Sequence, residues 1–227
     1  MKNNNENLYR ELKSLIEATN NTEKKCRAFL KHARDKLIDV TTETFIEEAE
    51  EYRGHLGDSD YLIICKCTNE SRIEKNRAYL WETKAPQCHL FEADGNNRVR
   101  PTSDFISAEN QLLHYFEESR GSNEFKAYFQ IIETDDVKLG GIIIGSQNTL
   151  VRGGKYNEKE RARLYLRALE LRQKHLYGYS GIKIMTWDYH ILEHLRPIVK
   201  LSQPVSQPVF TGAIGIQKST YTTVSSG

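Results

Sequence analysis

The sequence contains little of what marks several large classes of protein. Four of its 227 residues are cysteine, and no CxxC pair or histidine-rich spacing accompanies them, so neither a disulfide framework nor a zinc site is expected. No apolar run approaches the roughly 20 residues that a membrane-spanning helix needs. The N-terminal segment is polar, which is not typical of a secretory signal. These absences predict a cytoplasmic protein with reduced thiols and no membrane contact.

An excess of charge of either sign is also absent. The 32 basic and 31 acidic residues give a net charge of +1, so no global field would draw the protein onto nucleic acid. The charges are nevertheless unevenly placed. Residues 43–60 carry seven acids and one arginine, whereas residues 152–177 carry eight bases and three acids. A polyanion would therefore have to meet a local basic patch.

The length and the hydrophobic content fit one large domain with a small added element. Hydrophobic residues make up 38% of the chain, which is enough to build a core. We expect an N-terminal helical extension over residues 1–21 and the main domain over 22–200. Residues 201–227 carry a single charge and are rich in Ser, Thr, Gly and Gln, which predicts a low-charge C-terminal tail.

Periodicity predicts interleaved helices and strands. Helices are expected over residues 8–16, 22–37 with Thr22 as N-cap, 43–52, 107–119, 157–176, and from Asp188 to 195. Strands are expected over residues 60–67, 77–84, 87–92, 126–133, 140–145 and 181–186. This alternation predicts an α/β fold with a central mixed sheet flanked by helices.

One constellation of polar residues points to chemistry. Asp60 starts the first strand of a predicted hairpin and Glu82-Thr83-Lys84 ends the second, which gives the pattern D-x21-E-x-K. Alternation along the strand places Glu82 and Lys84 on one face and Thr83 on the other. Gln111 lies on the helix that follows. If the two strands pair, Asp60 approaches the same face.

These residue types are suited to a metal-dependent phosphodiesterase. Adjacent carboxylates repel unless a positive charge neutralises them, and Mg²⁺ prefers two carboxylates together with water and phosphate. Lys84 could then orient or deprotonate the attacking water. The alternative is that Glu82 and Lys84 form an ordinary solvated ion pair, worth well under about 1 kcal/mol. The apolar residues around the pair in AYLWETKAP argue against a solvent-facing strand.

Several segments resemble a known family in combination. The segments DYLIICKC, AYLWETKAP and SAENQLLHY are similar to the core of the PD-(D/E)xK nucleases, with its Asp, its ExK and its glutamine-bearing helix. The wider context resembles the Shedu immune nuclease domain within that superfamily. That context comprises TEKKCRAFLKHARDKLI, GGIIIGSQ and LRALELRQKHLYGYSGIKIMTWDYHIL. The resemblance covers roughly residues 22–195.

The resemblance implies a restriction-endonuclease-like core and Mg²⁺-dependent cleavage of DNA, with Mn²⁺ as a substitute for Mg²⁺. It further implies a role in bacterial defence against phage and assembly into homo-oligomers. Asp60, Glu82 and Lys84 match the family's catalytic set, with Asp60 and Glu82 as metal ligands, and Gln111 matches its supporting glutamine.

Other functions and residues stay open at this point. The chain could be a catalytically silent nucleic-acid-binding or scaffold subunit, or a resolvase or repair nuclease of the same fold, and RNA remains an alternative substrate. Glu23 is a candidate auxiliary acid or simply a favourable charge at a helix N-terminus. Asp58 competes with Asp60 for the metal, and we prefer Asp60 because it directly precedes the apolar strand. The basic residues of 152–177 form either a phosphate-contacting surface or a solvated helix face.

Overall fold

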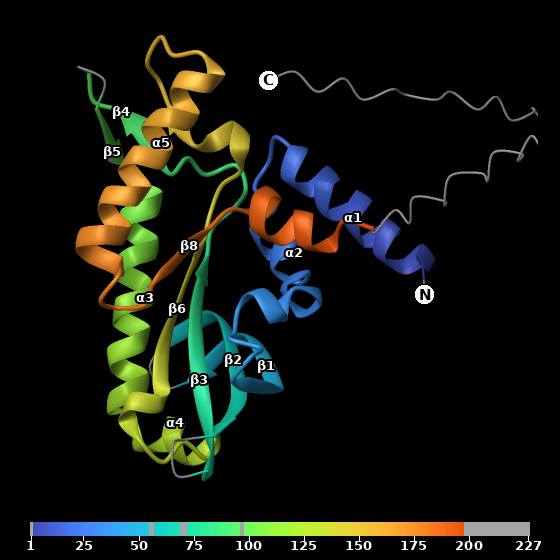
Figure 1. Cartoon of the computed structure of the whole chain (residues 1–227), viewed down its shortest axis with the longest axis vertical. Coiled ribbons are helices and arrows are strands. Elements are labelled where there is room, and N and C mark those ends of the chain that lie inside the picture. Colours follow the sequence, from blue (N-terminus) through green and yellow to red (C-terminus); the bar gives the residue numbers. More distant parts are fainter. Residues whose placement is uncertain (1, 55–56, 69–71, 96–97, 198–227) are drawn as a thin grey trace, which may run out of the picture. The chain divides into compact units, whose positions relative to one another are not determined.

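A five-stranded mixed sheet forms the centre of the computed structural model (Figure 1). The structure describes residues 2–54, 57–68, 72–95 and 98–197. In spatial order the strands are β1 (Glu43–Gly54), β2 (Gly57–Thr68), β3 (Glu74–Thr83), β6 (Val137–Ile143) and β8 (Lys183–Met185). β1, β2 and β3 pair antiparallel, whereas β3, β6 and β8 run parallel. The predicted α/β class with a central mixed sheet is therefore confirmed.

Helices cover both faces of this sheet. The α-helices of the described residues are α1 (Lys2–Glu17), α2 (Glu23–Arg27), α3 (Ser103–Gly121), α4 (Asn123–Tyr128) and α5 (Glu158–Arg172). Short helical turns are η1 (Leu30–His32), η2 (Arg34–Lys36), η3 (Thr134–Asp136), η4 (Gln147–Thr149), η5 (Gln173–Tyr177), η6 (Trp187–Leu192) and η7 (Glu193–Leu195). α3 and α5 lie on one side of the sheet, and α1 and α2 lie on the other (Figure 1).

The central strands are apolar on both sides because each face packs on its own layer of helices. In β2, Leu62 and Ile64 join the core formed with α3, α4 and α5. Their neighbours Ile63 and Cys65 join the core formed with α1, α2 and η6, where Leu12 of α1 is also buried. A strand buried on both faces shows a continuous apolar run instead of alternation, as the sequence does here.

A bulge between β3 and β6 makes room for a tryptophan next to the E-x-K motif. Leu80 pairs with Leu139 but Trp81 pairs with Gly141, so Gly140 is the extra residue. A Cβ at Gly140 would lie 2.3 Å from the Trp81 indole Nε1, closer than any real contact. Glycine is therefore required for Trp81 to fill this position.

The predicted acidic helix over residues 43–52 is wrong, because this segment forms β1. Glu and Ala favour a helix locally, but β1 pairs along its length with β2, and Phe45 packs against the core below. The backbone bonds and the burial gained at the sheet edge outweigh the local preference. A buried network also fixes the start of the strand, where Tyr79 and Arg77 both bond the carboxylate of Glu43.

Other boundaries also differ from the predictions. The sequence predicts a strand over residues 126–133, but α4 covers 123–128 because Phe125 and Phe129, one helical turn apart, both pack into the core. The helix expected over 22–37 shortens to α2 followed by η1 and η2. The last helix, predicted to start at Asp188, begins one residue earlier, so Asp188 is the second residue of η6. Its carboxylate accepts a hydrogen bond from the Gln147 N–H.

The remaining predicted segments fall in a second sheet or outside the described residues. The segment expected as one strand over 87–92 contributes β4 (Phe91–Ala93), which pairs with β5 (Val99–Pro101) and β7 (Val151–Arg152). The tail predicted over 201–227 lies outside the described residues. In the described part of the chain, no helix is both long and apolar enough to cross a membrane.

Candidate active site

The pairing of β2 with β3 brings two carboxylates face to face. Tyr61 pairs with Trp81, so the next step along the two strands sets Asp60 opposite Glu82. Lys84 follows the last residue of β3, and its N–H donates to the Ile143 carbonyl at the end of β6. The predicted D-x21-E-x-K pattern thus occupies the edge of the sheet where the parallel strands end.

Glu82 is the most deeply buried member of the site. Only 2% of the residue is exposed. Burial, followed by the negative charge of Asp60, raises the pKa of Glu82 to about 8, even though Lys84 acts in the opposite direction. The charged form of Glu82 is disfavoured both by burial and by the neighbouring Asp60, so it is stabilised by a nearby positive charge.

Lys84 connects Glu82 to α3. Its Nζ donates to Glu82 Oε1 and to Gln111 Oε1, each at 2.7 Å. Burial acts to lower the pKa of Lys84, but the hydrogen bond and the charge of Glu82 outweigh it and raise this pKa above its ordinary value. The side chain is therefore a protonated cation at neutral pH, which suits it to stabilising negative charge and not to accepting a proton.

Asp60 is fixed by three donors. Its Oδ2 accepts from the Thr83 N–H at 2.9 Å and from the Thr83 hydroxyl at 3.0 Å. Its Oδ1 lies 2.9 Å from the guanidinium Nη1 of Arg27. The prediction that Thr83 faces away from the site is therefore wrong for its hydroxyl. Thr83 is the last residue of β3, so the strict alternation of the strand no longer applies to it.

Glu23 adds a third carboxylate. It is the first residue of α2, and its Oε1 lies 3.2 Å from Arg27 Nη2. Burial and the charge of Asp60 raise its pKa, whereas Lys84, Arg27 and a backbone hydrogen bond from Ala85 lower it. Because Arg27 also contacts Asp60, Glu23 lies one side chain away from that carboxylate. The possibility of an auxiliary acid at this helix start thus has a structural basis.

Two side chains outside the carboxylate cluster hold its backbone in place. The Gln87 amide donates to the carbonyls of Leu15, Ile16 and Ala18 at the end of α1, and its oxygen accepts from Thr22 just before α2. The Trp187 indole donates to the Lys84 carbonyl at 2.7 Å. The segment after β3 is therefore tied to α1 and to η6.

The donor set fits a divalent cation of the Mg²⁺ type. Asp60 and Glu82 offer carboxylate oxygens, which are the hard ligands that Mg²⁺ prefers, and a Mg²⁺ site normally needs only one or two carboxylates completed by water and substrate. Among the described residues, no group of three or more His, Cys, Asp and Glu side chains is spaced to enclose a metal. The residues present therefore fit an open site and not a closed protein cage.

The structure thus brings together all four residues singled out in the sequence, Asp60, Glu82, Lys84 and Gln111. Asp58 lies in β2, and its side chain is outside the described part of the chain. Sequence reasoning missed Arg27, which the structure places between Asp60 and Glu23. The one signal for it was the spacing of four residues from Glu23, which brings two helical side chains together.

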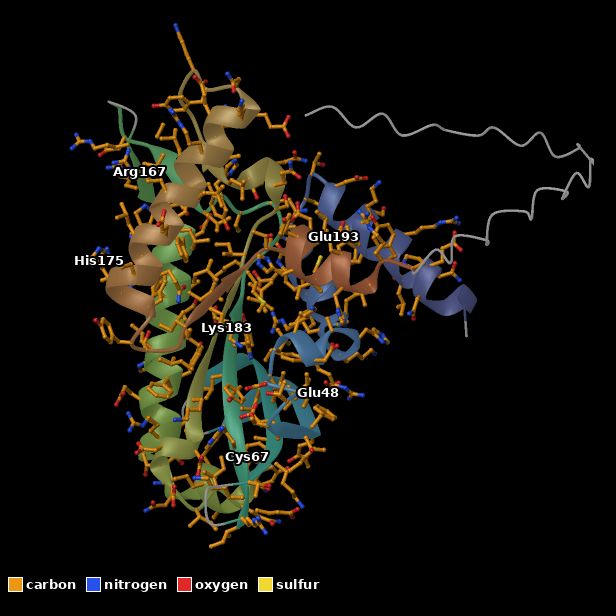
Figure 2. All side chains as sticks on the ribbon, viewed as in Figure 1. Glu48, Cys67, Arg167, His175, Lys183 and Glu193 are labelled. Carbon is orange, nitrogen blue, oxygen red and sulfur yellow. The ribbon has the colours of Figure 1, made fainter. Side chains whose placement is uncertain are left out.

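The basic helix α5 divides into structural and exposed arginines. Arg161 donates to the carbonyls of Val151 and Tyr156, and Arg172 pairs with Glu109 of α3. Arg163 and Arg167 are exposed. Figure 2 shows Arg167 on α5 and His175 on η5 extending away from the sheet. Of these four arginines of α5, Arg163 and Arg167 are therefore the ones exposed enough to contact a phosphate.

Comparison with known proteins adds no identification. The sequence matches no protein-family model, and no curated protein matches it.

Proposed function

We propose that the chain is a metal-dependent DNA endonuclease that acts in bacterial defence against phage. One observation carries the enzymatic part of the proposal. The Lys84 ammonium bridges Glu82 and Gln111 at 2.7 Å each, and the Asp60 carboxylate is near enough to help raise the pKa of Glu82. A solvated ion pair, the alternative considered for the sequence, does not fit a Glu82 that is 2% exposed.

Each residue of the cluster has a role in hydrolysis of a phosphodiester bond. Asp60 and Glu82 would hold the Mg²⁺, which supplies charge stabilisation to the scissile phosphate when bound. Lys84, whose raised pKa keeps it protonated, stabilises the charge that develops on the phosphate and orients the attacking water. Gln111 fixes the Lys84 ammonium, and Thr83 fixes the Asp60 carboxylate.

The choice of DNA, the defence role and a homo-oligomeric assembly rest on a different basis. It is the likeness of the E-x-K strand and its surrounding segments to the Shedu nuclease domain. Because the net charge is +1, one subunit alone is expected to bind DNA weakly. Several subunits together would then form the DNA-binding groove. Light scattering coupled to gel filtration tests the assembly, and a monomer at all concentrations would contradict it.

The deciding experiment measures cleavage of linear and circular duplex DNA with Mg²⁺, with and without EDTA. We expect cleavage by the wild type and none by Glu82→Ala or Lys84→Ala, while DNA binding persists in Lys84→Ala. Glu92→Ala is the matched control, because Glu92 also pairs with cations but lies in the second sheet, with Arg100 and Arg152. Its activity should equal that of the wild type.

The outcomes separate the proposal from its alternatives. Cleavage that survives Lys84→Ala would refute the assigned mechanism. DNA binding without cleavage by the wild type on any substrate would favour the silent scaffold, and a preference for branched DNA would favour a resolvase. Cells that carry the wild type should resist phage, and loss of this protection with Lys84→Ala would support the defence role. Equal phage plating on cells that carry the wild type and cells that carry Lys84→Ala would contradict it.

A further inference from the structure

The carboxylate cluster already contains a protein cation besides Lys84. Arg27 is 5% exposed, and its guanidinium lies 2.9 Å from Asp60 Oδ1, 3.3 Å from the Asp60 carbonyl and 3.2 Å from Glu23 Oε1. One arginine therefore joins the start of α2 to the part of β2 that carries the candidate metal ligand. A planar guanidinium with several donors suits this bridge between two acids better than a lysine does.

The two positive charges in the cluster contact different acids. Lys84 balances Glu82, whereas Arg27 balances Asp60 and Glu23. A divalent cation that binds Asp60 would have to approach the oxygen that faces Arg27, because the other oxygen accepts two hydrogen bonds from Thr83. The guanidinium and the metal would then share one carboxylate oxygen, and the repulsion between their positive charges would weaken metal binding.

We propose that Arg27 is a positioning residue that sets the metal affinity of the site by occupying Asp60 Oδ1 as a built-in counter-ion. This proposal rests on the proposed function, since it takes the metal to be held by Asp60 and Glu82. It goes further by assigning a role to a residue outside the D-x21-E-x-K pattern. Arg27 keeps the acids together and weakens the site for the metal at the same time.

The test is a titration of the full chain with Mn²⁺ alone, without nucleic acid, in which free Mn²⁺ is counted by electron paramagnetic resonance. Arg27→Met removes the charge and the competing donors, and we expect it to lower the Kd for Mn²⁺ at least tenfold. Arg27→Lys keeps the charge, and its Kd should stay within about threefold of the wild type. Arg27→Gln removes the charge but keeps a donor, and should again bind more tightly than the wild type.

Arg161→Met is the matched control. Arg161 is a partly buried arginine whose hydrogen-bond partners among the described residues are the carbonyls of Val151 and Tyr156, away from the acids, so its loss should leave the Kd for Mn²⁺ unchanged. Melting curves show which variants fold, and Arg27→Gln decides the matter if Arg27→Met does not fold. A folded charge-removing variant with unchanged or weaker binding would overturn the role of Arg27.

Failure of the proposed function has a different signature. Saturable binding by the wild type that Glu82→Gln abolishes supports the metal site itself, whatever the arginine variants do. If neither the wild type nor a folded charge-removing variant of Arg27 binds Mn²⁺, both the metal site and the proposed role of Arg27 are refuted. If only the charge-removing variants bind measurably, both are supported.

Discussion

The burial of Glu82 makes protein stability depend on pH in a definite direction. The pKa of its carboxyl group lies near 4.5 in an unfolded chain and is raised to about 8 in the fold. Between these values the folded state binds more protons than the unfolded state, so linkage requires the free energy of unfolding to fall as the pH rises. This contribution is fully present below the unfolded value and is lost as the pH passes through the folded one.

Replacing Glu82 by Gln removes this proton while keeping an acceptor for Lys84. The slope of the missing contribution is about 1.4 kcal/mol per pH unit well inside the window and about half of that at pH 8. From pH 6 to pH 8, the free energy of unfolding of Glu82→Gln should therefore rise by about 2 kcal/mol relative to the wild type. Any constant offset from the altered hydrogen bond to Lys84 cancels in this comparison.

The assay is urea unfolding of both proteins at pH 6, 7, 8 and 9, with EDTA to remove metal. Glu92→Gln is the control, since the pKa of Glu92 is lowered by its bonds to Arg152 and Arg100 and does not titrate in this range. Its difference from the wild type should not change between pH 6 and 8. If the free energies of unfolding of Glu82→Gln and the wild type change in parallel with pH, the assignment of a raised pKa to Glu82 is refuted.

Three further outcomes follow from contacts elsewhere in the fold. Gln87→Ala removes the amide that ties α1 to the segment after β3, and should lower the free energy of unfolding in urea by about 2 kcal/mol. A loss under about 0.5 kcal/mol would contradict this role. Gly140→Ala forces a Cβ against the Trp81 indole and should destabilise the protein by about 1–3 kcal/mol, whereas Gly121→Ala, which meets nothing, should be neutral by the same measurement. Replacing Arg163 and Arg167 together by Gln should weaken DNA binding and reduce the slope of log K against log salt by about 2, and an unchanged slope would show that α5 faces elsewhere.

The site could be predicted from the sequence where one strand determines the geometry. Alternation predicts that Glu82 and Lys84 meet, as their hydrogen bond shows, and Asp60 comes opposite Glu82 because the polar turn between two apolar segments favours antiparallel pairing. Gln111 follows from its place on the next helix. The metal, the DNA substrate and the catalytic roles of these residues stay predictions.

The missed features depend on contacts between distant segments. The segment from Glu43 has the composition of a helix, and only its pairing with β2 makes it a strand. Arg27 looks like any cation on an amphipathic helix, and only the packing of α2 beside β2 directs it to Asp60. The Thr83 hydroxyl turns to Asp60 because it stands where the strand ends. Local preferences carry no information on any of these contacts.

The bond between Trp187 and Lys84 has a consequence for the order of folding. It joins residues 103 apart in the chain, whereas Gln111 meets Lys84 from 27 residues away and Arg27 meets Asp60 from 33. Closing a longer loop costs more entropy, so contacts of this separation form slowly relative to local ones. In a growing polypeptide, the lysine of the E-x-K motif lacks its last support until the tryptophan has been made. A fragment that stops short of η6 therefore carries every acid and base of the cluster but lacks the indole that fixes the Lys84 carbonyl.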